Sequence, residues 1–314
     1  MNERTKLASF AVFTHILLLP LILALIPFLP GLSNQILIIV QTLLIILFLA
    51  GYWEFFGMRL RIIYLILIEF LMFVLLYYQA KTGISEFPGK IVLAGSAVIE
   101  LFLITKLVRI FVVILKTVRN SVEIEFPLKN GIFLITDGGN SKTSRLMNYH
   151  YYSPLHRKQG TNNSMKFATD IVRLGSSAGT FFPKTNEDYP VWGDKVYSPV
   201  SGTVYKAENG IDDNIPFSGS YPYNTGNTVV IRDGDLFMLI GHLRKGSVRV
   251  ATGDYVSAGE LIAEAGNSGY SERPHIHMQL IRCEKDNFWN GTGVPVTYRK
   301  RNLFKNRIIP VTRS

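Results

Sequence analysis

Two histidines separated by one residue are the feature of this sequence that most clearly suggests chemistry. His275 and His277 lie in a segment that reads as a β-strand, in which residues i and i+2 point to the same side of the sheet. Both imidazoles can therefore reach one site. This arrangement suits a zinc centre in which one histidine binds the metal and its neighbour transfers protons.

Cysteine has no part in such a centre. Cys283 is the only cysteine of the chain, which excludes an intramolecular disulfide and a cysteine-based metal cluster. Any metal ligands therefore come from histidines and carboxylates. Five of the six histidines lie after residue 120, at His150, His156, His242, His275 and His277.

The residues around the histidine pair resemble a known family. Five motifs occur in the family's order, at residues 192–204 (WGDKVYSPVSGTV), 227–232 (NTVVIR), 240–243 (IGHL), 250–265 (VATGDYVSAGELIAEA) and 266–279 (GNSGYSERPHIHMQ). Together they resemble the M23 (LytM/lysostaphin-type) zinc peptidases over roughly residues 122–285. The resemblance implies a hydrolase, a metalloprotease that cuts peptide bonds in the peptidoglycan of bacterial cell walls.

The resemblance also implies roles for particular residues. Asp170 and His277 match positions that hold zinc in the family. His275 and His242 match the two histidines that act on water and on the developing oxyanion, as general base and as stabiliser. Lys166 stands where the family has its early histidine ligand, and a protonated lysine has no lone pair for a metal.

The missing ligand has two possible replacements upstream. His150, in the segment Asn-Tyr-His-Tyr, is expected to be the third ligand and to complete a two-histidine, one-carboxylate set with Asp170 and His277. His156, in a basic Pro-Leu-His-Arg-Lys context, is the second choice. If neither binds, the alternative is a catalytically silent M23-like domain that binds the cell wall or activates another wall hydrolase.

The second part of the chain, residues 119–314, predicts a mainly antiparallel β-domain. Short alternating segments bounded by Gly, Pro, Asn and Asp are typical of strands, and helices of ordinary length with Ser or Thr caps are not expected. The expected strands are residues 196–204, 228–232, 236–242, 248–250, 261–265 and 275–281. The Asp-Gly-Asp sequence at residues 233–235 predicts a hairpin turn.

The first part, residues 1–118, predicts a transmembrane helical anchor. Four apolar stretches, at residues 7–29, 36–52, 60–78 and 91–115, are each near the roughly 20 residues that a helix needs to cross a membrane. His15, Glu69 and Glu100 fall inside them. Either these side chains bond one another within the bundle or they mark a transporter or sensor, and the attached β-domain favours the first reading.

Charge predicts the partners and leaves a conflict about orientation. The net charge of +10 is shared about evenly by the two parts, which gives no basic stripe for nucleic acid. Expected partners are peptidoglycan and the lipid membrane. Lysines and arginines near the apolar stretches mildly favour cytoplasmic termini, whereas peptidoglycan requires the second part outside. The chemistry decides the predicted location: the bacterial cytoplasmic membrane, multi-pass, with the C-terminal domain extracytoplasmic.

Overall fold

The described part of the chain is one β-rich unit. The computed structural model describes residues 120–139, 148–175, 183–284, 287–305 and 307–312. All of them fall within a single compact unit, Ile114–Ser314. The division of the chain at residue 118 remains a prediction.

Fourteen strands and a few short helices make up these residues. The strands are β1 (Val122–Glu123), β2 (Gly131–Asp137), β3 (Thr169–Arg173), β4 (Lys195–Tyr197), β5 (Gly202–Glu208), β6 (Asn227–Asp233), β7 (Leu236–Leu243), β8 (Tyr255–Val256), β9 (Leu261–Glu264), β10 (Ile276–Arg282), β11 (Thr292–Val294), β12 (Val296–Tyr298), β13 (Arg301–Asn302) and β14 (Ile308–Val311). The helices are α6 (Tyr149–Tyr152), α7 (Pro154–Lys158), α8 (Asn162–Met165) and the 3₁₀ turns η4 (Asn186–Asp188) and η5 (Phe288–Asn290).

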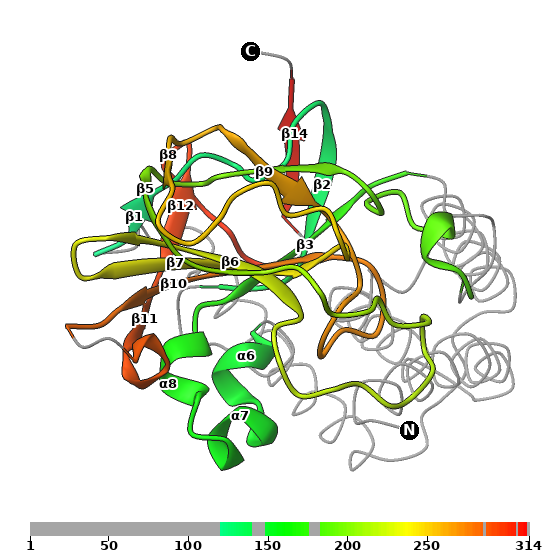
Figure 1. Ribbon diagram of the computed structural model, residues 1–314, viewed down its shortest axis with the longest axis horizontal. Helices are drawn as coiled ribbons and strands as arrows, with labels where there is room; N and C mark the ends of the chain where they lie inside the picture. The colour runs from blue at the N-terminus through cyan, green and yellow to red at the C-terminus, as the bar shows by residue number, and fades with distance from the viewer. Residues whose placement is uncertain (1–119, 140–147, 176–182, 285–286, 306, 313–314) are drawn as a thin grey trace, which may run out of the picture. The chain divides into compact units, whose positions relative to one another are not determined.

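One large antiparallel sheet carries the structure (Figure 1). Its strand order is β14-β2-β3-β10-β7-β6-β5-β8, and β11 also pairs with β10. Strand β10 lies between β3 and β7, so its residues have hydrogen-bonded neighbours on both sides. Smaller sheets join β1 with β12 and β13, and β4 with β9.

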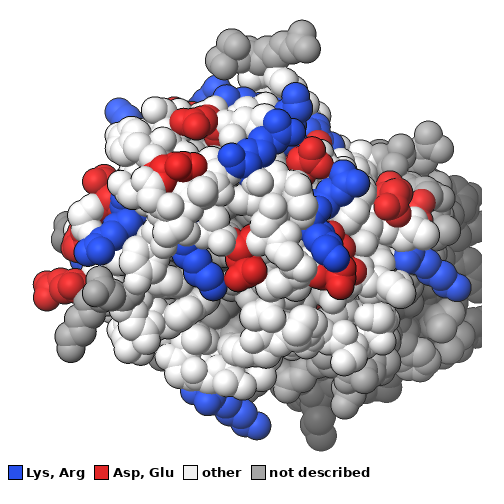
Figure 2. Space-filling view, in the orientation of Figure 1, with Lys and Arg blue, Asp and Glu red and all other residues white. Residues whose placement is uncertain are grey.

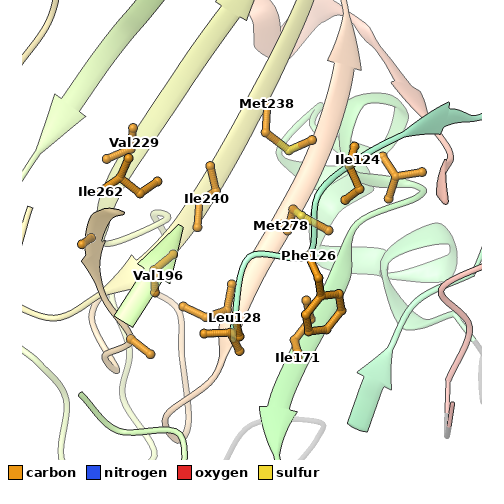
Figure 3. Packing of buried hydrophobic residues seen from close by; sticks show 14 of the residues in the cluster. Ile124, Phe126, Leu128, Ile171, Val196, Val229, Met238, Ile240, Ile262 and Met278 are labelled. Carbon is orange, nitrogen blue, oxygen red and sulfur yellow. The ribbon is translucent and has the colours of Figure 1, made fainter. Parts of the chain in front are cut away.

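The hydrophobic core covers one face of this sheet. Alternation along β10 turns Ile276, Met278 and Leu280 into the core, while the residues between them point to the opposite face. The chain between β1 and β2 crosses over the core face, and Figure 3 shows its Phe126 next to Ile171 of β3. The remaining cover comes from β4 and β9. The opposite face is thus left for other elements.

Three short helices lie together on that opposite face, beside β10 (Figure 1). Their ends are fixed by side chains, because short helices have many unpaired backbone groups. The Asn148 side chain accepts a hydrogen bond from the Tyr151 amide, and the Ser153 hydroxyl accepts one from the His156 amide. Pro154 occupies the first turn of α7, where its missing N–H costs nothing. These caps fix where α6 and α7 begin.

Most of the expected strands correspond to observed ones, with two exceptions. Residues 196–204 form two strands, β4 and β5, because residues 198–201 turn between them and Gly202 follows with φ of 159°. Residues 248–250 are not a strand. The hairpin between β6 and β7 turns at Gly234 as expected, with φ of 59°.

The transmembrane part of the predicted fold class is corrected. Among the described residues, no helix is long and apolar enough to cross a membrane. Their longest α-helix, α7, has five residues, about 7.5 Å against the roughly 30 Å of hydrocarbon to be crossed. The four expected spans lie in residues 1–119, outside the described residues. What the structure supports is a mainly antiparallel β-domain with short helices, and the predicted multi-pass membrane location is withdrawn.

Candidate metal centre and active site

A cross-strand pair begins the site. Asp170 of β3 and His277 of β10 are direct partners in the antiparallel register, on the sheet face opposite the core. His277 Nδ1 lies 2.9 Å from Asp170 Oδ1. Both side chains are 2% exposed. Their positions follow from the alternation that places Ile171, Ile276 and Met278 in the core.

Helix α6 brings a third side chain to the same carboxylate. His150 Nε2 lies 3.2 Å from Asp170 Oδ1. Asp137, at the end of β2, accepts hydrogen bonds from the amides of Gly138 and Tyr149 and lies 3.9 Å from the same His150 nitrogen. Asp137 therefore ties the start of α6 to the sheet. The sequence reading missed it, because an Asp before two glycines looks like an ordinary turn.

These three residues form a possible metal site. One ligand atom each from His150, Asp170 and His277 lies within 4.8 Å of the other two. Two neutral imidazoles and one carboxylate are a donor set suited to a divalent metal with an open coordination position. The site therefore fits a metal on the chemistry of its donors.

A residue not singled out in the sequence orients His277. The Oε1 atom of Gln279, two residues along β10, lies 3.0 Å from His277 Nε2. If the ring donates its Nε2 proton there, its Nδ1 lone pair points towards Asp170 and His150, as a metal ligand requires. A Gln two residues after a histidine in a strand shares its face, and this spacing was the available signal.

An unusual backbone conformation aims His242 at the site. Gly241 is the register partner of His277, so the next residue of a regular strand would point into the core. His242 instead has φ of 60°, in the left-handed region that few non-glycine residues adopt. Its ring centroid lies 4.7 Å from that of His275 and 5.5 Å from that of His277. The strained residue thus joins the histidine cluster.

Backbone carbonyls fix the rings of His242 and His275. His242 Nδ1 lies 2.7 Å from the Ser268 carbonyl oxygen, and His275 Nδ1 lies 2.9 Å from that of Arg273. Each ring therefore donates its Nδ1 proton to the backbone. The other nitrogen of His275, Nε2, is on the site side, 3.7 Å from Asp170 Oδ1.

The surroundings lower the pKa values of both Asp170 and His242. Burial raises the pKa of Asp170, but the neighbouring His150, His275 and His277 outweigh it and hold that pKa well below its usual value. Burial, followed by repulsion from His275 and His277, pushes the pKa of His242 well below its usual value. At neutral pH the carboxylate is ionised and His242 is neutral.

The two remaining residues of the sequence analysis lie outside the three-residue set. Lys166 ends α8, and its Nζ donates to Asn163 Oδ1 at 3.1 Å. His156 is buried behind His150, with His156 Nε2 3.5 Å from His150 Nδ1. Of the two upstream histidines, His150 is thus the one next to Asp170.

Charge is spread over the surface. In the face shown in Figure 2, acidic and basic side chains of the described residues are interspersed. Some are paired, as Arg244 with Glu264 at 3.0 Å and Arg282 with Asp235 at 3.0 Å. On this face, the basic side chains of the described residues are not gathered into one patch.

Gly269 and Gly226 are in close contact beside Ser268, whose carbonyl oxygen lies 2.7 Å from His242 Nδ1. We expect a side chain at Gly269 to destabilise the domain. A Cβ atom on Gly269, where φ is 74°, would lie 2.2 Å from the Gly226 nitrogen. We expect Gly269→Ala to lower the free energy of unfolding by about 1–3 kcal/mol through overpacking, beyond the strain of a positive φ. Chemical denaturation of the full-length protein measures this.

Gly234→Ala is the matched control. Gly234 also has a positive φ, 59°, but its Cβ would meet nothing within 4 Å. It therefore carries the backbone strain of about 1–2 kcal/mol without the clash. Equal destabilisation by the two substitutions would contradict the role of the close contact.

Comparison with known proteins identifies the class of domain. Residues 187–291 match the model of peptidase family M23, about a third of the chain. The chain therefore carries an M23 peptidase family domain. His242, His275 and His277 lie inside the matched range, whereas His150 and Asp170 precede it.

The individual relatives match over limited lengths. The chain is 46% identical over 61 residues to endolysin 2638A of Staphylococcus phage 2638A, covering 18% of this chain and 13% of the endolysin. It is 32% identical over 121 residues to the peptidoglycan DD-endopeptidase ShyA of Vibrio cholerae, covering 38% of this chain and 25% of that protein. The chain thus spans a quarter or less of the length of these two relatives.

One solved structure is matched over a larger share of its length than these two relatives are. The catalytic domain of the antimicrobial peptidase lysostaphin from Staphylococcus simulans is 22% identical, with a TM-score of 0.26. The match covers 41% of this chain and 75% of that one.

Proposed function

We propose that this protein is a zinc-dependent endopeptidase that hydrolyses peptide bonds in peptidoglycan and so remodels the cell wall. The observation that carries the proposal is the set of three ligand atoms, from His150, Asp170 and His277, within 4.8 Å of one another. A catalytic zinc site usually has three protein ligands. His150 supplies the third ligand, which Lys166 cannot supply. The M23 match and the similarity to a peptidoglycan endopeptidase support the substrate class.

The residues around this set have different roles in the proposed reaction. Bound zinc lowers the pKa of water and polarises a carbonyl oxygen. His275 donates its Nδ1 proton to the Arg273 carbonyl, so the Nε2 that faces the site has a lone pair and can accept a proton from the attacking water. His242, whose ring centroid lies 4.7 Å from that of His275, is assigned to stabilise the developing oxyanion. Gln279 orients the ligand His277, and Asp137 holds the start of α6, which carries His150.

Metal content tests the ligand set. We expect the full-length wild-type protein to bind one zinc ion, and His150→Ala to lose it, because removal of one of three protein ligands leaves too few. Lys166→Ala is the control, since the Lys166 side chain contacts Asn163 and not the site, and we expect it to keep its zinc. Elemental analysis after dialysis against a weak chelator gives the stoichiometry.

Hydrolysis is measured on the same proteins. We expect purified peptidoglycan to be cut by the wild type and by Lys166→Ala, and to remain intact with His150→Ala. A zinc-bound wild type that cuts no peptidoglycan tested would argue for the silent, wall-binding alternative. A wild type without zinc would reject the ligand set itself.

A further inference from the structure

A row of hydrogen-bonded side chains runs from His150 away from the Asp170 carboxylate. His150 Nδ1 lies 3.5 Å from His156 Nε2, and His156 Nδ1 lies 3.2 Å from the Tyr223 hydroxyl. That hydroxyl lies 3.1 Å from Thr161 Oγ1, which lies 3.5 Å from the His156 carbonyl oxygen. The row joins α6, α7, the start of α8 and the loop before β6.

Packing fixes the rings in this row. The rings of His150 and His156 are nearly parallel, with an interplanar angle of 16° and a centroid separation of 5.7 Å, and they meet edge to edge through Nδ1 and Nε2. Both are buried, with exposed fractions of 5% and 3%. The Ser153 cap and the Thr161 amide, which donates to the His156 carbonyl at 3.0 Å, hold the backbone of α7. His156 therefore has one orientation relative to His150.

The hydrogen bonds of this row determine which ring nitrogen of His150 and of His156 carries the proton. If His150 donates its Nδ1 proton to His156 Nε2, then His156 carries its own proton on Nδ1 and donates it to the Tyr223 hydroxyl. Tyr223 in turn donates to Thr161 Oγ1, and Thr161 donates to a backbone carbonyl. Every donor then has an acceptor. The Nε2 of His150 is left with its lone pair on the side of Asp170, the form that binds a metal.

We propose that His156 is a positioning residue that holds His150 in the metal-binding tautomer, and that Tyr223 in turn fixes the tautomer of His156. This inference rests on the proposed function, because it takes His150 as a metal ligand. It also explains a buried histidine that is next to the site without being in the ligand set. Tyr223 belongs to a loop 67 residues further along the chain than His156, so the tautomer of the ligand His150 also depends on that loop.

Two substitutions at His156 separate hydrogen bonding from packing. His156→Phe keeps an aromatic ring but removes the acceptor for the His150 proton. His156→Gln removes the ring but can place an amide oxygen near the former Nε2 position. We expect His156→Phe to weaken zinc affinity about 10–100-fold, as loss of such outer hydrogen bonds commonly does, and His156→Gln to recover most of it.

The measurement uses the metal alone. Full-length proteins are stripped of metal, and Zn²⁺ affinity is determined by competition with a chromophoric chelator. Co²⁺ absorption spectra report on the ligand geometry independently of hydrolysis. Tyr223→Phe is a third variant that keeps every ring, and we expect a smaller loss of affinity in the same direction. It provides the test should His156→Phe fail to fold.

Each outcome decides the inference. Wild-type affinity in His156→Phe and Tyr223→Phe would overturn it, and so would equal losses in His156→Phe and His156→Gln, because an acceptor near the former Nε2 position would then not restore zinc affinity. A lower affinity in His156→Phe that His156→Gln restores supports it. A wild type that binds no Zn²⁺ would instead reject the proposed metal site, which keeps the two failures distinct.

Discussion

Replacing His242 is expected to lower the rate of peptidoglycan hydrolysis by about 10²–10³-fold, the usual contribution of a group that stabilises a developing oxyanion. The residue lies outside the three-ligand set, so bound zinc should remain. Because its φ is 60°, the choice of replacement matters. Asn tolerates the left-handed conformation better than Ala. His242→Asn therefore removes the imidazole with the least added strain, and hydrolysis of purified cell walls measures its effect.

The control is a remote surface substitution on the same sheet. Tyr255 of β8 is 70% exposed, and Tyr255→Ala should leave hydrolysis, zinc and stability unchanged. If His242→Asn keeps wild-type activity, His242 is not part of the chemistry. If it loses zinc together with activity, its role is in metal binding or folding rather than in stabilising the oxyanion.

The largest expected loss of stability comes from the core beneath the site. Phe133 of β2 is fully buried, and its ring packs against Phe126 at a centroid distance of 5.4 Å. Phe133→Ala should lower the free energy of unfolding by about 3–5 kcal/mol, because it removes a large apolar side chain and leaves a cavity. Denaturant titration of the full-length protein, followed by fluorescence, measures the change.

The neighbouring residue supplies the control. Ile132 points to the other side of the same strand and is 51% exposed. Ile132→Ala should change stability by no more than about 0.5 kcal/mol. Similar losses at the two positions would show that the face of β2 turned towards the core is assigned wrongly.

The parts of the fold that follow a two-residue period could be predicted from sequence. Strands β6, β7, β9 and β10 have apolar residues and bounding turns that indicate them directly. The break between β4 and β5 was missed, because residues 196–204 were interpreted as one strand although Pro199 and Gly202 interrupt them. Strands β2 and β14, which continue the sheet beyond β3 and its Asp170, were not predicted, since their pairing depends on contacts between distant parts of the chain.

The site was predictable where it follows a motif or simple ligand chemistry. The motifs pointed to His242, His275, His277 and Asp170, and the lack of a lone pair on Lys166 pointed to an upstream histidine. That His150 and not His156 lies next to Asp170 depends on how α6 and α7 pack, which no local pattern reveals. The positive φ of His242 and the contact of Gln279 with His277 are likewise products of the sheet register.

The central place of β10 in the sheet has a consequence for synthesis of the protein. Asp170 and His277 meet across two adjacent strands, yet 107 residues separate them along the chain. While the ribosome is still adding the residues between them, a chain that already carries His150 and Asp170 has no partner strand for β3 on the side of the site. The metal site is therefore complete only after β10 has been synthesised and has paired with β3 and β7.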